Sequence, residues 1–317
     1  MKFDLSFPGS VASIDIGTNT ILLLVAETKE GVVKPLFEEE TIVRLGEGLQ
    51  RNGVLSAEAM KRGLQTLSQY LDRCHAMGIQ RVFAVGTSAL REARNSGDFL
   101  GMVKDRLNLP IEVVSGEEEA ELSFLAAARD LGGLEKSIFV VDVGGGSTEF
   151  VQGKADRVTQ WTSLPMGSVR STEKFLLSDP VQEAEWKALQ REIRKLLANI
   201  PRSRDPLSLV AVGGTATTLA SVEQGLTEFI PEKIHHFVLE REALRNQLTL
   251  YRSQTLEQRK TIPGLSPARA DVILAGGAIL YLTMEDLGFL STVISCHGVR
   301  YGLLYKKIAN GGLGMAD

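Results

Sequence analysis

The chain has 317 residues, 44% of them hydrophobic and 23% charged, and its mean hydropathy of +0.02 is typical of a soluble globular protein of two domains. The 35 Lys and Arg are balanced by 39 Asp and Glu, and the resulting formal charge of −4 excludes a basic field for nonspecific nucleic-acid binding. The two cysteines show no metal or redox spacing, no apolar run could span a bilayer, and MKFDLSFPGS lacks a signal-peptide core, so we expect a cytoplasmic protein.

The first part of the chain alternates strands with helices, which predicts an α/β layer. Residues 10–28 read SVASIDIGTNTILLLVAET, two apolar β-rich runs around a polar turn, and this pattern predicts a hairpin. Ser56 is a credible N-cap for a helix with leucines at helical spacing. Further strands are expected near 39–45, 81–86 and 111–114, followed by a helix over 118–131.

The second part repeats the plan of the first. The strand 137–142 leads into DVGGGSTEF at 142–150, as the first strand leads into DIGTNT at 15–20, and the repeat predicts two similar α/β halves. A third unit of strand and glycines stands at 208–221. We also expect a helix over 180–200 with Asp179 as N-cap, an apolar helix from 266 to 282, a strand at 292–295 and a terminal helix.

The glycine-rich turns are candidate phosphate sites. Three glycines after a strand bring unhindered backbone N–H groups to one point, although a tight hairpin explains a single triplet equally well. Three such turns favour phosphate, because they would converge if the two halves face each other across a cleft. The predicted phosphate-binding residues are Thr18, Asn19, Thr20, Gly144, Gly145, Gly146, Ser147, Thr148, Gly213, Gly214 and Thr215.

Two acids flank the triglycine loop. Asp142 and Glu149 would repel a bound phosphate unless a hard cation mediates, and carboxylates and water are the ligands that Mg²⁺ favours. We therefore expect Mg²⁺ held by Asp142, with Glu149 reaching it through water. The alternative is that Glu149 faces solvent on an alternating strand.

A residue that activates water is expected in SGEEEAELSF, residues 115–124. Acids at a helix start are favoured by the helix dipole in any case, and Ser115 and Glu118 have the spacing of a capping box. Glu119 lies about 100° further round the helix and is left for catalysis. Arg91, just after a strand, is the candidate guanidinium for phosphate oxygens. The four histidines, His75, His235, His236 and His297, show no ligand spacing and are interpreted as structural.

Six segments together resemble the exopolyphosphatase and guanosine pentaphosphate phosphohydrolase family: SIDIGTNTILLLVAE, AVGTSALREARN, VSGEEEAELSF, VVDVGGGSTEF, LPMGSVRSTEKF and VAVGGTATTLAS. That family belongs to the superfamily of actin, hexokinase and the heat-shock chaperones. The resemblance therefore implies an α/β fold of two ribonuclease-H-like (actin-like ATPase) domains with the site in the cleft between them. We expect domains at 1–125 and 126–300, with a terminal helix, 301–317, packing back on the first.

By the same resemblance Glu119 matches the family's catalytic glutamate. Residues 18–20, Arg91 and the loop 144–148 match its phosphate-binding elements, and Asp142 and Glu149 match its metal-side acids. Longer members continue with a helical domain, whereas this chain stops at Asp317. We therefore expect short polyphosphate chains or a nucleotide tail as substrate, and a homodimer by resemblance alone.

The predicted function is removal of the terminal phosphate of inorganic polyphosphate with Mg²⁺ and a glutamate-positioned water. Guanosine pentaphosphate is the rival substrate, disfavoured because ILLLV after Thr20 offers no basic side chain for the extra phosphates. A kinase of the same superfamily would need an acceptor pocket, and a noncatalytic alarmone sensor would bind without turnover. No nucleic-acid or membrane partner is expected.

Overall fold

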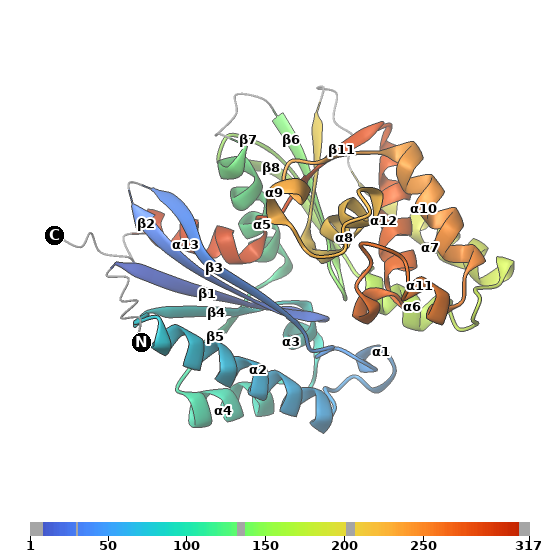
Figure 1. Cartoon of the computed structure of the whole chain (residues 1–317). Coiled ribbons are helices and arrows are strands. Elements are labelled where there is room, and N and C mark those ends of the chain that lie inside the picture. The colour runs from blue at the N-terminus through green and yellow to red at the C-terminus, as the bar shows by residue number, and fades with distance from the viewer. Residues whose placement is uncertain (1–8, 30, 132–136, 201–206, 311–317) are drawn as a thin grey trace. The chain divides into compact units, whose positions relative to one another are not determined.

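The computed structural model describes residues 9–29, 31–131, 137–200 and 207–310, which form two compact units (Figure 1). Unit 1 comprises Met1–Leu122 and Val299–Asp317, and unit 2 comprises Ser123–Gly298. The chain enters unit 2 within one helix, α5 (Gly116–Asp130), and leaves it just before α13 (Val299–Ala309). Residues 1–8, where no leader is expected, and 311–317, the end of the expected terminal helix, lie outside the described residues.

Unit 1 is built on a five-stranded sheet of order β3-β2-β1-β4-β5. The strands are β1 (Ser10–Ile16), β2 (Thr20–Lys29), β3 (Val32–Ile42), β4 (Val82–Gly86) and β5 (Ile111–Val113). The first three are antiparallel, whereas β1, β4 and β5 are parallel. The hairpin predicted over 10–28 is β1 with β2. The strand expected near 39–45 starts earlier, at Val32, because β3 is an edge strand that tolerates Pro35 and exposed charges, which hide its alternation.

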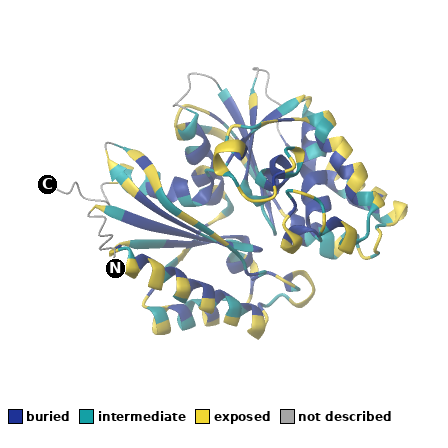
Figure 2. Ribbon diagram, in the orientation of Figure 1, coloured by how far each residue is buried: buried dark blue, intermediate teal, exposed yellow. Residues whose placement is uncertain are grey.

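Helices cover both faces of this sheet. They are α1 (Leu49–Asn52), α2 (Ala57–Ala76), α3 (Ser88–Glu92), α4 (Ser96–Leu107) and α13. The predicted N-cap is present, since Ser56 Oγ accepts from Ala59 N at 3.1 Å. Neighbouring residues of β4 belong to different cores: Ala84 packs with α2 and α4, and Val85 packs with α13. The inner strands β1, β2 and β4 are therefore largely buried on both sides, and they are mostly dark in Figure 2.

Unit 2 is built on a six-stranded sheet of order β10-β11-β9-β6-β7-β8. Its strands are β6 (Ser137–Val143), β7 (Thr148–Lys154), β8 (Arg157–Leu164), β9 (Ser208–Val212), β10 (Val238–Glu240) and β11 (Ser291–Ser295). Strands β6, β9 and β11 are parallel, and β6, β7 and β8 are antiparallel. The run β8-β7-β6-β9-β11 thus repeats β3-β2-β1-β4-β5 in order and direction. The internal repeat predicted from DIGTNT and DVGGGSTEF is a repeat of sheet topology.

The helices of unit 2 form one large core with this sheet, to which α7, α8, α10 and α12 contribute most. They are α6 (Ser168–Phe175), α7 (Glu183–Leu197), α8 (Gly213–Glu223), α9 (Pro231–Ile234), α10 (Arg241–Ser253), α11 (Leu256–Arg259), the 3₁₀ turn η1 (Pro267–Arg269) and α12 (Ile273–Leu287). The prediction that α7 starts at Asp179 was wrong. Gln182 caps it, its N–H donating to Glu185 at 3.0 Å, while the Asp179 carboxylate accepts from Leu256 N instead.

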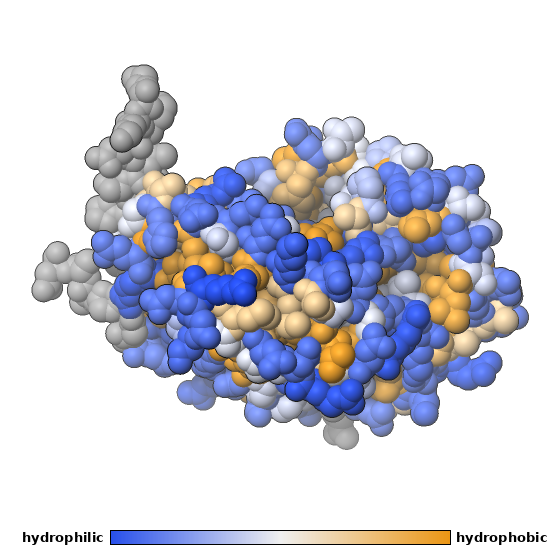
Figure 3. All heavy atoms as spheres, turned by 90° about the horizontal axis from the view of Figure 1, so that it is seen from below, coloured by the Kyte–Doolittle hydropathy of each residue, from blue (hydrophilic) through white to orange (hydrophobic). Residues whose placement is uncertain are grey.

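The exposed surface is mixed. On the face seen in Figure 3, hydrophilic residues surround smaller groups of hydrophobic ones, as is usual for globular proteins. Among the helices of the described residues, none is long and apolar enough to cross a membrane. Even α12, which is almost wholly buried in unit 2, has only 15 residues.

Candidate active site

In unit 1 the candidate residues lie where the parallel strands end. Thr87 N donates to Ile16 O at the end of β1, and Val114 N donates to Gly86 O at the end of β4. The turn between β1 and β2, the start of α3 and the start of α5 therefore follow strands that end at one edge of the sheet. In open α/β sheets this edge is the usual place for ligands.

The turn at residues 17–20 is held by its backbone. Gly17 N donates to Thr20 O at 2.9 Å, and Asn19 O accepts from the N–H groups of Val43 and Arg44. Thr18 and Asn19 are buried, each 6% exposed. Asn19 Nδ2 has no hydrogen-bond partner among the described residues. A buried amide donor without a partner is costly, so the turn is suited to an added acceptor such as a phosphate oxygen.

Arg91 and Glu119 are direct partners. Nη1 of Arg91 donates to Glu119 Oε2 at 2.9 Å and to Val114 O at 3.0 Å. Glu119 is 7% exposed, and the ion pair holds its carboxylate in one orientation. The neighbouring Glu118 forms the expected capping box with Ser115, and the hydrogen bond from the Ser115 backbone lowers the pKa of Glu118. The two adjacent acids therefore have separate tasks.

In unit 2 the triglycine loop joins β6 to β7, and its carbonyls are bound on one side. Gly144 O accepts from Ser168 N, Gly145 O from the N–H groups of Val169 and Arg170, and Gly146 O from Arg170 Nε at 2.6 Å. All these donors belong to the start of α6. In the described part of the chain the backbone N–H groups of Gly145 and Gly146 have no acceptor. The loop thus presents donors away from α6, which is the arrangement of an anion-binding nest.

Asp142 and Glu149 lie side by side. They are directly paired in the β6–β7 register, so their side chains point to the same face of the sheet. Ser123 Oγ donates to Asp142 Oδ2 at 2.6 Å, and Ser163 Oγ donates to Glu149 Oε1 at 2.8 Å. Burial raises the pKa of Asp142, and the bond from Ser123 opposes that rise. Two neighbouring carboxylates repel each other, and this oxygen donor set fits a hard divalent cation such as Mg²⁺.

The start of α8 completes the group in unit 2. Gly213 has φ +85°, and a Cβ there would lie 2.7 Å from Asp142 Oδ1, so only glycine fits. Thr215 Oγ1 donates to Val143 O at 3.2 Å, which ties α8 to the end of β6. The guanidinium of Arg269, from η1, packs directly on Gly214. The N-terminus of α8 thus lies beside the Asp142 carboxylate, and a buried arginine packs on the second residue of that helix.

The predicted residues fall into two sets. Unit 1 holds Thr18, Asn19, Thr20, Arg91 and Glu119, and unit 2 holds Asp142, Gly144 to Glu149 and Gly213 to Thr215. Sequence reasoning gave no role to Ser123, Ser163, Arg170 and Arg269. Ser123, inside VSGEEEAELSF, and Arg170, inside LPMGSVRSTEKF, stood in segments that carried the resemblance, and nothing local marks Ser163 and Arg269.

Comparisons with known proteins place the chain in one family. The family model described as the Ppx/GppA phosphatase family matches residues 24–310. The exopolyphosphatase 2 of Mycobacterium tuberculosis is 37% identical, over 92% of this chain and 97% of that protein. A bifunctional 3-dehydroquinate synthase/phosphatase of Fusobacterium nucleatum is 32% identical, over 94% of this chain and 46% of that protein.

Two solved structures share the fold. The Ppx/GppA family member of Aquifex aeolicus has a TM-score of 0.81 and 34% identity, covering 95% of this chain and 98% of its own. An exopolyphosphatase of Cytophaga hutchinsonii has a TM-score of 0.85 and 25% identity, with the same two coverages. The predicted fold class, α/β of the actin-like ATPase type, is confirmed by these neighbours and by the two sheets.

Proposed function

The chain belongs to the Ppx/GppA phosphatase family, and on that premise we propose that it hydrolyses the terminal phosphate of inorganic polyphosphate with Mg²⁺ and a water molecule positioned by Glu119. The family and its named exopolyphosphatase relatives make the protein a phosphatase, hence a hydrolase. The choice of polyphosphate, the cation and the water belong to the proposal.

The observation that carries the proposal is the triglycine loop. Its carbonyls accept hydrogen bonds from the start of α6. The N–H groups of Gly145 and Gly146 have no acceptor among the described residues and can therefore donate to a bound phosphate. Backbone donors suit every phosphate of a polymer alike, because they carry no side chain that selects a base or sugar. Asn19 Nδ2 in unit 1 is a further buried donor of this kind.

Glu119 would orient the attacking water and accept its proton. Arg91 holds the Glu119 carboxylate through Nη1, and the rest of its guanidinium is suited to the charge that develops on the transferred phosphoryl group. A positioned carboxylate of this kind is worth roughly a hundred- to ten-thousand-fold in rate. One fixed pair would thus supply both the acid–base group and part of the charge stabilisation.

Asp142 and Glu149 would hold the Mg²⁺, with Asp142 as the direct ligand. When bound, the cation neutralises charge on the phosphate oxygens. The two acids accept hydrogen bonds from the hydroxyls of Ser123 and Ser163, which fix the orientation of both carboxylates. Fixed carboxylates of this kind are what a hard cation needs.

Guanosine pentaphosphate is the second candidate. The side chains of β2 after Thr20 are Ile21, Leu22, Leu23 and Leu24, and three of these four are fully buried in unit 1. This stretch therefore offers no cation for the two extra phosphates on a guanosine ribose. The feature favours polyphosphate without deciding chain length.

The test is phosphate release from polyphosphate, guanosine pentaphosphate and ATP, each with and without Mg²⁺. We expect release from polyphosphate that EDTA abolishes and excess Mg²⁺ restores. Release from guanosine pentaphosphate alone would replace polyphosphate as the substrate. Turnover only with an added hydroxyl acceptor would indicate a kinase, and binding without turnover would indicate a sensor.

The proposal also includes the expected homodimer, and sedimentation equilibrium tests this oligomeric state.

A further inference from the structure

Two polar residues of α5, Ser123 and Asp130, form hydrogen bonds with residues that lie in one register row of the unit 2 sheet. Asp142, Val212 and Ser295 are register partners across β6, β9 and β11, so the side chains of Asp142 and Ser295 point to the same face. Two strand spacings separate them by roughly 10 Å. Ser123 and Asp130 are seven residues apart on α5, two turns or roughly 10 Å along one face. Ser123 bonds Asp142, and Asp130 bonds Ser295.

At the first point, Ser123 controls the Asp142 carboxylate. Ser123 is fully buried, and its hydroxyl donates to Oδ2 at 2.6 Å, a short bond typical of a charged acceptor. The other oxygen, Oδ1, packs against Gly213, where no side chain fits. Both oxygens are thereby placed, one by α5 and one by the start of α8. A carboxylate held in this way loses little freedom when it binds a cation.

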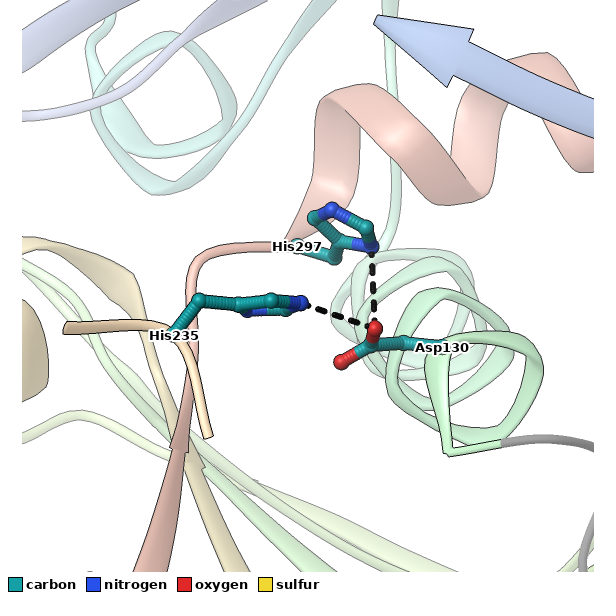
Figure 4. A group of neighbouring side chains, drawn as sticks. All are labelled: Asp130, His235 and His297. Carbon is teal, nitrogen blue, oxygen red and sulfur yellow. Dashed lines mark hydrogen bonds and ion pairs between the residues drawn. The ribbon is translucent and has the colours of Figure 1, made fainter. Parts of the chain in front are cut away.

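At the second point, Asp130 ends the helix inside a cluster of hydrogen bonds, part of which Figure 4 shows. Oδ1 contacts His235 Nε2 at 2.9 Å and His297 Nδ1 at 3.5 Å. Oδ2 contacts His236 Nε2 at 3.1 Å and accepts from Ser295 Oγ at 2.9 Å. The rings of His235 and His236 stack with centroids 4.0 Å apart. The cluster therefore fastens the end of α5 to β11 and to the turn before β10.

Asp130, His235 and His297 also have the composition of a metal site, since their ligand atoms lie within 4.8 Å of one another. A backbone hydrogen bond to His235 argues against metal binding by this cluster. Cys296 N–H donates to His235 Nδ1 at 3.1 Å, so Nδ1 carries no proton and Nε2 of the neutral ring does. Nε2 therefore faces Asp130 as a donor. A metal on Nε2 would move the proton to Nδ1, against the Cys296 N–H group, so the cluster is better suited to hydrogen bonds than to a metal.

We infer that α5 is the positioning element of the cation site: Ser123 orients the Asp142 carboxylate, and the Asp130 cluster holds the helix that carries Ser123. This inference rests on the proposed function in one respect, the role of Asp142 as a cation ligand. Ser123 acts through Asp142 and is a positioning residue. Three of the four histidines interpreted as structural, His235, His236 and His297, acquire a specific task, which is to fix the far end of the same helix.

The experiment measures Mn²⁺ binding by electron paramagnetic resonance, with Mn²⁺ standing in for Mg²⁺, alongside polyphosphate hydrolysis. Ser123→Ala should raise the Mn²⁺ dissociation constant, and the Mg²⁺ concentration for half-maximal rate, by about tenfold. The rate at saturating Mg²⁺ should stay within about threefold of wild type, because the ligand itself remains. Ser123→Cys, which fills the same space with a weaker donor, should give values of both constants between those of wild type and Ser123→Ala. Asp130→Asn should shift both constants in the same direction by a smaller factor.

The matched control is Thr283→Val. Thr283 is also fully buried in unit 2, and its hydroxyl bonds Ile279 O at 2.8 Å within α12, with no part in the cation site. Its Mn²⁺ affinity should equal that of wild type. An equal loss in this control, or wild-type affinity in Ser123→Ala, would overturn the inference. So would Asp142→Asn with undiminished Mn²⁺ binding.

Two further results separate this inference from the proposed function. A wild-type protein that releases no phosphate but loses Mn²⁺ affinity on Ser123→Ala would keep the positioning role and reject the function. Normal polyphosphate hydrolysis with an unchanged Mn²⁺ dissociation constant in Ser123→Ala would keep the proposed function and reject the positioning role. Zn²⁺ titration completes the set: tight Zn²⁺ binding that is lost in His297→Ala would overturn the assignment of the Asp130 cluster as a hydrogen-bonded anchor.

Discussion

Nη1 of Arg91 donates a hydrogen bond to Oε2 of Glu119 across 2.9 Å. The two residues come from different helices of unit 1, and each has its own expected role, Arg91 toward phosphate and Glu119 toward water. Their contact couples those roles. The guanidinium orients the carboxylate, and the carboxylate in turn keeps the guanidinium beside Val114 O. Substitution of either residue should therefore affect the chemical step rather than the fold.

Glu119→Gln should lower the rate of phosphate release by about a hundred- to ten-thousand-fold, because the amide cannot take a proton from water. Its oxygen can still accept from Arg91, so the melting temperature should change little. The measurement is steady-state phosphate release together with thermal unfolding. Glu117→Gln is the control, since Glu117 is an exposed acid of the same helix turn. Equal rates in Glu119→Gln and wild type would remove Glu119 from the mechanism.

Arg91→Lys should lower kcat/KM by about a hundredfold, as is typical when one donor to the transition-state charge is lost. The ammonium keeps the charge but cannot hold Glu119 and Val114 O while also presenting a planar fork to phosphate. Arg94→Lys is the matched control, because Arg94 is exposed and, in the part of the chain that the structure describes, the hydrogen bond of its Nη2 goes to the backbone oxygen of Asn52. If both variants lose activity equally, the effect is one of general charge and the assigned role is wrong.

Gly167→Ala should disturb the phosphate loop from outside. A Cβ at Gly167 would lie 2.4 Å from the backbone C and O of Gly145, so either the loop or the start of α6 must shift. We expect a loss of roughly 1–3 kcal/mol in unfolding free energy and a larger loss of phosphate release. Gly101→Ala, in α4 with open space around its Cβ position, should instead stabilise slightly. Full activity in Gly167→Ala would show that the loop conformation is not required.

The Asp130 cluster should make stability depend on pH in the acid range. Burial acts to raise the pKa of Asp130, but the hydrogen bonds from His235 and Ser295 and the electrostatic interactions with His297 and His235 outweigh it and lower the pKa from 3.8 to about 2. Because the folded pKa is depressed, the stabilisation is present above pH 4 and is lost as the pH falls toward 2. The difference corresponds to roughly 2 kcal/mol.

Urea unfolding of wild type and Asp130→Asn at a series of pH values between 7 and 2 measures this effect. The wild type should lose more stability than the variant between pH 5 and 2, and the two curves should converge at the acid end. A constant difference over that range would contradict the assigned cause, since an uncharged role of Asp130 would not depend on pH.

Much of the unit 1 chemistry could be predicted from local sequence. Ser115 and Glu118 have capping-box spacing, and the helix geometry then leaves Glu119 on another face, which is where the structure has it. The prediction that Asp179 caps α7 failed because a contact that is distant in sequence outweighed the local signal. Asp179 has every local feature of an N-cap, but its carboxylate bonds Leu256 N, 77 residues away, and Gln182 caps the helix instead.

The amino-acid sequence by itself determined the glycine-rich turns, the order of strands and helices and the acids beside them, because turns, caps and strand alternation depend on neighbours a few residues apart. Only the tertiary structure decided that Ser123 meets Asp142 and that three histidines with no ligand spacing surround Asp130. Those contacts join residues up to 167 positions apart, such as Asp130 and His297. These contacts depend on the register of the parallel strands and on the pitch of α5, which packs against them. No short stretch of sequence encodes how strand register and helix pitch combine.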